Sequence, residues 1–378
     1  MKSLIVCLLF IELITPRFIL APEKPVYNDN PVADSMPLTL NKTVLNKSFL
    51  AFPIVLRSLE TGWGFGGGSA VFVKHNKKAD TAVRTSDISF LGLYTLKKQL
   101  IFVVNSTIYF PHENKILRFQ TSYSYYPDHF WGLGNHSLYS AEEGFTQKQF
   151  FFNPQILKRV HKKLYLGGSY EFQHTTIVIY KPNGIFDQQN IAGRFGGNSS
   201  GIGPLISWDT RNNAYSPGKG LFAEVQYIFF GSVLGSDFKF SLFNLDYRQF
   251  FSFSKTSVLA LQAIGGLGSG NVPFRKLEEL GGSDMMRGYY GGRFTDRCLM
   301  AYQAEWRQFL FWRIGIVGFL SAGQVSSTVN RFAINEFHPA GGGGLRFALS
   351  KEEKLNLRID YGIGRHSKAF NLQIREAF

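Results

Sequence analysis

Apolar and polar residues alternate with a period of two along much of this chain, in runs of about ten residues. Clear examples are the apolar sets Leu117, Phe119, Thr121, Tyr123 and Tyr125; Phe243, Leu245 and Tyr247; and Leu355, Leu357, Ile359, Tyr361 and Ile363. Because successive side chains of a β-strand point to opposite faces, each run predicts a strand with one apolar, aromatic face and one polar face.

Two kinds of connection separate these runs. Short ones are expected at 111–115, 161–163, 211–220, 254–257, 309–312 and 350–354, and longer ones at 127–143, 175–198 and 268–297. One strand on each side of every connection gives about 16 strands, at roughly 20 residues per strand with its connection. Short turns at one end and long loops at the other are typical of a membrane barrel.

Composition decides between a barrel and a soluble sandwich, which would show the same alternation. Aromatic residues make up 16% of the 378 residues and charged residues only 18%, with a mean hydropathy of −0.06. Lipid outside, a polar lumen and aromatic girdles account for these values, whereas no stretch approaches the roughly 20 apolar residues of a membrane helix. We therefore expect an all-β protein, a transmembrane antiparallel β-barrel of about 16 strands.

The N-terminal segment differs from the rest of the chain. Residues 1–21 begin with Lys2, continue with a short apolar core and end on Ala21, as in a secretory signal peptide. Residues 22–47 are rich in Pro and Asn and read as a periplasmic linker, and residues 48–378 form the expected barrel. Cleavage would leave Cys298 as the one thiol of the mature chain.

The formal net charge of +14 arises from scattered pairs and triplets at apparent turns. No nucleic-acid-binding motif accompanies the charge, so nucleic acid is not expected as a partner. The expected partner is outer-membrane lipid, including the phosphates of lipopolysaccharide. The eight His lack metal-ligand spacing and no Ser lies in a nucleophile motif. We expect no enzyme, metal or cofactor.

The last expected strand is amphipathic and ends the chain on an aromatic residue. Phe370, Leu372 and Ile374 alternate with polar residues, and Phe378 follows in the same register. This arrangement resembles the signal by which assembly machinery recognises outer-membrane barrels, and it indicates a location in the bacterial outer membrane.

Three blocks of sequence carry a family resemblance. The first is the segment from Leu280 to Tyr290, with Gly281, Gly282, Met286, Arg287, Gly288 and Tyr289; the second is a hairpin with Asp209, Arg211, Asn213, Pro217 and Gly220; the third is Ala304-Glu305-Trp306-Arg307. Together they resemble the BamA/TamA family of outer-membrane proteins, also called the bacterial surface antigen family, over about residues 52–378. The resemblance implies that the apolar-Arg-Gly-aromatic tetrad at 286–289 folds back into the barrel lumen.

An arginine inside the lumen needs a carboxylate partner. The resemblance implies an Asp in a Phe-x-Asp-x-Gly pattern, but here Phe319 is followed by Ser321 at the Asp position. Alternation places Glu305 and Asp360 on the polar faces of their strands, and these are the candidate partners of Arg287, with Glu305 favoured.

The resemblance also implies a function. Family members that insert other barrels carry folded periplasmic domains, and residues 22–47 are too few to form one. We therefore expect the membrane domain without receiving domains, acting as a component of outer-membrane protein assembly or secretion with separate periplasmic proteins as possible partners. The alternative is a passive pore or structural barrel. The sequence names no substrate.

Overall fold

The computed structural model describes residues 44–76, 84–350 and 354–378. The expected signal peptide and residues 22–43 of the expected linker lie outside these ranges. The first strand already begins at Val44, so residues 44–47, which we expected in the linker, belong to it. The correction has a simple cause, because the second strand extends to Asn76 and pairs with the first up to Val44.

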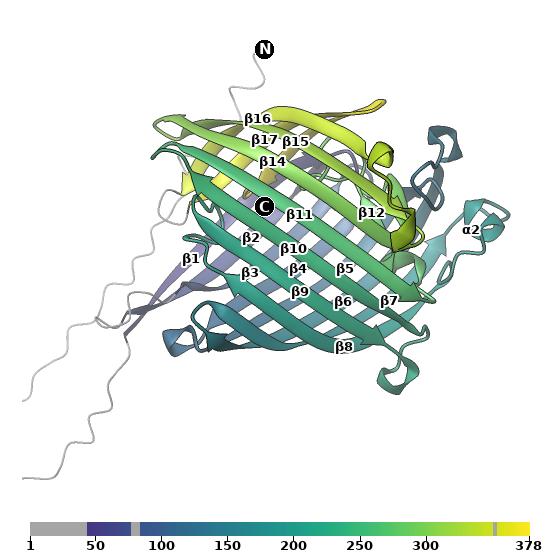
Figure 1. The fold of residues 1–378 in the computed structure, drawn as a ribbon, viewed down its shortest axis with the longest axis horizontal. Helices are drawn as coiled ribbons and strands as arrows, with labels where there is room; N and C mark the ends of the chain where they lie inside the picture. Colours follow the sequence, from purple (N-terminus) through teal and green to yellow (C-terminus); the bar gives the residue numbers. More distant parts are fainter. Residues whose placement is uncertain (1–43, 77–83, 351–353) are drawn as a thin grey trace, which may run out of the picture. The chain divides into compact units, whose positions relative to one another are not determined.

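Sixteen antiparallel strands close into a barrel, as the alternation predicts. They are β1 (Val44–Ser58), β2 (Gly62–Asn76), β3 (Ser86–Thr95), β4 (Leu100–Tyr109), β5 (Lys115–Phe130), β6 (Glu143–His161), β7 (Leu164–Ile179), β8 (Gly196–Asp209), β9 (Gly220–Phe230), β10 (Phe240–Ser252), β11 (Ser257–Gly270), β14 (Cys298–Phe311), β15 (Ile314–Ser326), β16 (His338–Ser350), β17 (Leu355–Gly364) and β18 (Ser367–Ile374). Figure 1 shows these strands running obliquely around the barrel.

Short elements lie in the connections. They are α2 (Ile185–Gln188), the 3-10 turns η1 (Pro111–Glu113), η2 (Tyr139–Ala141), η3 (Ser232–Leu234), η4 (Phe274–Lys276), η5 (Val329–Arg331) and η6 (Ile334–Glu336), and a hairpin of β12 (Glu278–Leu280) and β13 (Phe294–Asp296). None of the helices in the described ranges is long and apolar enough to cross a membrane.

The connections divide the barrel into two ends. Loops 131–142, 180–195, 271–297 and 327–337 lie at what we call the long-loop end. The chain returns through 110–114, 162–163, 210–219, 253–256 and 312–313 at the short-turn end. The division agrees with the sequence-based expectation for the long loops, although the short connections 59–61, 96–99 and 365–366 also lie at the long-loop end.

Cross-strand register shows which face each residue occupies. Tyr361 pairs with Phe370 and both are exposed on the outer surface, whereas the neighbouring pair of Asp360 and Asn371 is buried inside. Outward aromatic residues recur around the barrel, among them Phe65, Phe90, Phe102, Trp208, Trp306 and Tyr361. Part of the aromatic excess therefore covers the outer face, as expected for a surface in contact with lipid, while another part, including Phe130, Phe186 and Phe274, is buried.

Candidate functional site in the barrel lumen

Loop 271–297 carries its tip into the barrel interior. The paired strands β12 and β13 form its stem, and the tip between them buries Met286, Arg287 and Tyr289 almost completely. Gly288 has φ +143°, and a Cβ there would lie 2.7 Å from the backbone nitrogen of Gly364 on β17. Only glycine permits so close an approach of loop and wall, so the tetrad at 286–289 folds inward as the resemblance implied.

Arg287 meets both carboxylates that the sequence singled out. Its Nη2 donates to Oε2 of Glu305 on β14 at 2.5 Å, and its Nη1 donates to Oδ2 of Asp360 on β17 at 2.8 Å. The guanidinium carbon lies 3.6 Å from the ring centroid of Phe319 on β15, a cation–π contact. The three groups hold the loop tip to three separate strands.

Ser321 stands where the family resemblance implied an aspartate. Its hydroxyl donates to the Ala340 carbonyl at 3.4 Å rather than contacting Arg287. Asp360, two strands further along the wall, supplies the second carboxylate instead. An acid on β17, rather than the expected acid on β15, therefore binds Arg287.

Further arginines surround the two acids. Arg307 donates to Oε1 of Glu305 at 2.7 Å, and Arg346 donates to Oδ1 of Asp360 at 2.6 Å and to Glu376 at 2.7 Å. These two arginines, together with Arg287, are set against the three buried carboxylates of Glu305, Asp360 and Glu376. Removing one partner of such a buried network leaves an uncompensated charge, which typically costs about 3–5 kcal/mol.

Tyr289 completes the attachment of the loop tip. Its hydroxyl donates to the Pro339 carbonyl at 3.0 Å and accepts the backbone N–H of Arg365 at 2.7 Å. Its ring packs edge-on against Phe294 in the stem. The aromatic position of the tetrad therefore joins the loop to β16 and to the β17–β18 turn.

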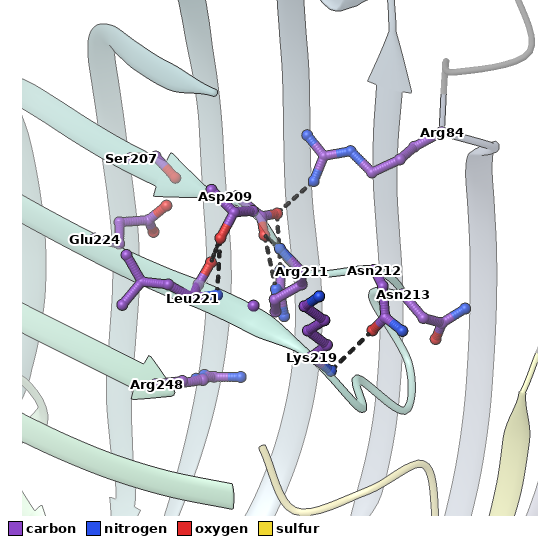
Figure 2. A network of polar contacts seen from close by, with 12 residues as sticks. Arg84, Ser207, Asp209, Arg211, Asn212, Asn213, Lys219, Leu221, Glu224 and Arg248 are labelled. Carbon is purple, nitrogen blue, oxygen red and sulfur yellow. Dashed lines mark hydrogen bonds and ion pairs between the residues drawn. The ribbon is translucent and has the colours of Figure 1, made fainter. Parts of the chain in front are cut away.

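The hairpin motif lies at the other end of the barrel, in the connection between β8 and β9 (Figure 2). Arg211 binds Asp209 through two contacts, of 2.9 and 3.1 Å, and Asn213 Oδ1 accepts the backbone N–H groups of Tyr215 and Ser216. Gly220 has φ +109°, and a Cβ there would lie 2.4 Å from the Thr210 carbonyl. Pro217 lies within the same turn, and its carbonyl accepts a long hydrogen bond from Arg307.

Arg84 connects this hairpin to the β4–β5 turn. As Figure 2 shows, its side chain reaches Asp209, and its backbone N–H donates to Glu113 at 2.8 Å. Lys163 also donates to Glu113, at 2.7 Å. Burial alone would raise the pKa of Glu113, but the charges of Arg84 and Lys163 outweigh burial and hold that pKa below its usual value.

Sequence reasoning missed this latch of Arg84, Glu113 and Lys163. All three lie in or beside short turns, where charged residues are usually solvated. The one indication in the sequence was Asp209, an acid of the hairpin motif. It already had Arg211 as a neighbour, so a second arginine partner was not expected.

The chain ends differently from expectation. Phe370, Leu372 and Ile374 lie on β18 with Phe370 facing outward, but the strand ends at Ile374. Arg375 has φ +83°, which turns the backbone out of the strand register. Phe378 is buried in the lumen beside Phe250, 6.3 Å between ring centroids, and its carbonyl accepts from Arg307. The expected common register of all four residues is therefore wrong at Phe378.

The closure between β1 and β18 is the weakest joint of the barrel. The two strands pair at a single position, Arg57 with Leu372, whereas β1 pairs with β2 along its whole length. We call this closure the seam. The tail turns inward at the point where further pairing with β1 would have continued.

A closed antiparallel barrel that holds an arginine-tipped loop in its own lumen defines a class of membrane barrel. An Omp85 superfamily domain model matches residues 66–374, and the chain belongs to the Omp85 superfamily. The expected kinship with BamA/TamA-type barrels is thereby confirmed. No curated protein matches the chain by sequence.

Solved structures share the fold. BamA from Haemophilus ducreyi lacking POTRA domains 1-3 is 13% identical, with a TM-score of 0.57 over 90% of this chain and 74% of that chain. CdiB from Acinetobacter baumannii is 12% identical, with a TM-score of 0.56 over 88% of this chain and 60% of that chain. CdiB from Escherichia coli is 9% identical, with a TM-score of 0.55 over 87% and 62%. The chain thus spans less than two thirds of either CdiB chain.

Proposed function

We propose that this barrel inserts or secretes proteins in the bacterial outer membrane, with its short-turn end toward the periplasm, and that client chains leave it through the seam. The single pairing between β1 and β18 carries the proposal. An edge strand with unpaired N–H and C=O groups is a template for pairing with another strand. The strong β1–β2 pairing would keep that template in place during opening.

The lumen supports this function over a passive pore. Loop 271–297 occupies the interior, and Asn135 of loop 131–142 donates to the Glu336 carbonyl of loop 327–337 across the long-loop end. Arg293 in turn donates to Ser137. These contacts tie three loops together over the lumen, an arrangement that favours lateral release over passage straight through.

A reversible lock on the seam tests the proposal. Arg57→Cys with Leu372→Cys, in a Cys298→Ala background, places two thiols at the paired position. Oxidation should stop delivery of other barrels, measured as their loss from the outer-membrane proteome of cells that carry only this variant, and reduction should restore them.

The matched control locks a continuous strand pair instead. Leu357→Cys with Ile374→Cys joins β17 to β18 at paired positions and should leave the proteome unchanged in either redox state. A seam-locked variant that keeps a normal proteome, together with steady conductance of the wild-type barrel in planar bilayers, would contradict the proposal in favour of the passive pore.

A further inference from the structure

The lumenal wall beside the seam is largely apolar, unlike the rest of the interior, although Asp87, Ser89 and Asn105 also lie on its inward face. On β1 the inward positions are Leu50, Phe52, Ile54 and Leu56, and register continues this face through Ala70 and Phe72 on β2, Leu91 and Leu93 on β3, and Ile101 and Val103 on β4. The facing strands carry Gln262, Gln303, Glu305 and Arg307 inward. A lumen filled with water is expected to have polar walls, so this apolar wall indicates a different occupant.

A groove of about 250 Å³ follows this wall and passes through the seam. Its lining includes the inward residues Leu50, Phe52 and Leu91, and also Leu355 and Ile374, which alternation places on the outer face of β17 and β18. The lipid-facing surface therefore continues into the lumen where β1 and β18 do not pair. Outward Phe49 and Val55 make β1 apolar on both faces.

The length of the groove suits a hydrocarbon chain. Leu50 to Leu56 covers about 20 Å along β1 at about 3.3 Å per residue. The hydrocarbon of one bilayer leaflet is about 15 Å deep, half of the about 30 Å core. An acyl chain lying along β1 would remove this apolar wall from water.

A cation stands at the short-turn rim of the groove. Arg375 is exposed, its guanidinium carbon lies 5.4 Å from the ring centroid of Tyr215, and both residues line the groove. The described residues show no ion pair between Arg375 and a carboxylate, and the one acid in the groove lining is Asp87 on the lumenal face of β3. A guanidinium is well suited to bind a phosphate through two parallel hydrogen bonds.

We propose that this groove is a phospholipid site, with one acyl chain lying along the lumenal face of β1 and the phosphate held by Arg375. The lipid enters sideways from the leaflet at the short-turn end. The site is independent of whether the barrel handles client proteins, because it needs only the open seam, the apolar wall and the arginine.

Site-specific photocrosslinking identifies the occupant. Benzoylphenylalanine is placed at Leu91 in the groove, at Phe102 on the outer face of β4 and outside the groove lining, and at Gln262 on the polar lumenal wall. The purified full chain is reconstituted in vesicles of phosphatidylglycerol and phosphatidylethanolamine, irradiated and weighed by mass spectrometry. We expect phospholipid adducts at positions 91 and 102 and none at 262.

Two further variants separate the parts of the site. Arg375→Gln should lower the adduct yield at position 91 several-fold and leave position 102 unchanged, and Val103→Trp, which fills the groove without adding charge, should do the same. Heat-modifiable gel migration identifies the variants that have folded.

Other occupants would overturn the proposal. A position-91 product joined to residues 1–43 of the same chain, or to another protein when the experiment is repeated in cells, shows that a polypeptide holds the groove. Absence of a lipid adduct at 91 beside a normal adduct at 102 shows that no lipid enters. An unchanged yield in Arg375→Gln overturns the role of the arginine.

Discussion

Arg287 places a full positive charge in the middle of the barrel, completely buried between Glu305, Asp360 and the ring of Phe319. A charge in this position is costly unless its partners are equally fixed. The partners are fixed here by Arg307 and Arg346, which hold the far oxygens of the two acids. The loop tip is therefore held in one position by charge pairing.

Replacing Arg287 with Met should destabilise the barrel by about 3–5 kcal/mol, because Glu305 and Asp360 lose a shared cation. The measurement is heat-modifiable migration in a denaturing gel, where the folded form should be lost at lower temperature. The double variant Arg287→Met with Glu305→Gln should recover part of the loss, since one uncompensated charge is removed. Equal heat resistance of Arg287→Met and wild type would contradict a stabilising role for the ion pairs of Arg287 with Glu305 and Asp360.

Strand alternation alone placed both acids on the lumenal face, which is why the partners of Arg287 could be predicted. It could not decide between Glu305 and Asp360, because the choice depends on how deep the loop tip lies. The latch of Arg84 and Glu113 could not be predicted, because these turn residues meet only through the curvature of the closed barrel.

At the level of elements, loop 271–297 and β17 approach each other backbone to backbone. Gly288 of the loop faces Ile363 and Gly364, with no room for a Cβ. The tetrad thus depends on the glycine as much as on the arginine, because only that approach brings Arg287 to Asp360.

Gly288→Ala should release the loop tip and lower heat resistance, since both the strained backbone and the contact with β17 oppose the added methyl group. Limited proteolysis should then cut within loop 271–297. The control is Gly318→Ala on the outer face of β15, where no atom lies within 4 Å of the added carbon. Proteolysis of both variants at the same rate would argue against close packing of the loop.

Sixteen strands and their two kinds of connection could be predicted from the period of two, because every strand has one face toward lipid and one toward the lumen. The inward turn of the tail did not follow, because Phe378 continues the alternation in sequence and only the positive φ of Arg375 interrupts it. The weak pairing at the seam could not be predicted either, because pairing between the first and last strands produces no local pattern in the sequence.

For the molecule as a whole, the latch at the short-turn end joins parts of the wall that are distant in sequence. Arg84 precedes β3, Glu113 lies between β4 and β5, and Asp209 ends β8. The latch therefore ties the half of the barrel next to the seam to the opposite half.

This latch should weaken in acid. The folded pKa of Glu113 lies below its usual value of about 4.3, so its stabilisation is complete above that pH and is lost as pH falls through the lower folded pKa. Glu113→Gln should flatten the acid limb of heat resistance measured against pH. Glu142→Gln, which removes a half-exposed acid at the long-loop end, should keep the wild-type profile.

The terminal residue changes its accessibility as the barrel closes. In an unfolded chain the side chain of Phe378 is exposed to solvent. In the closed barrel its ring lies against Phe250 and its carbonyl accepts a hydrogen bond from Arg307. A factor that recognises the chain by its last residue can therefore tell unfinished copies from finished ones. Closure of the barrel hides the side chain of Phe378, so a protein that bound this residue would bind unfolded copies and not folded ones.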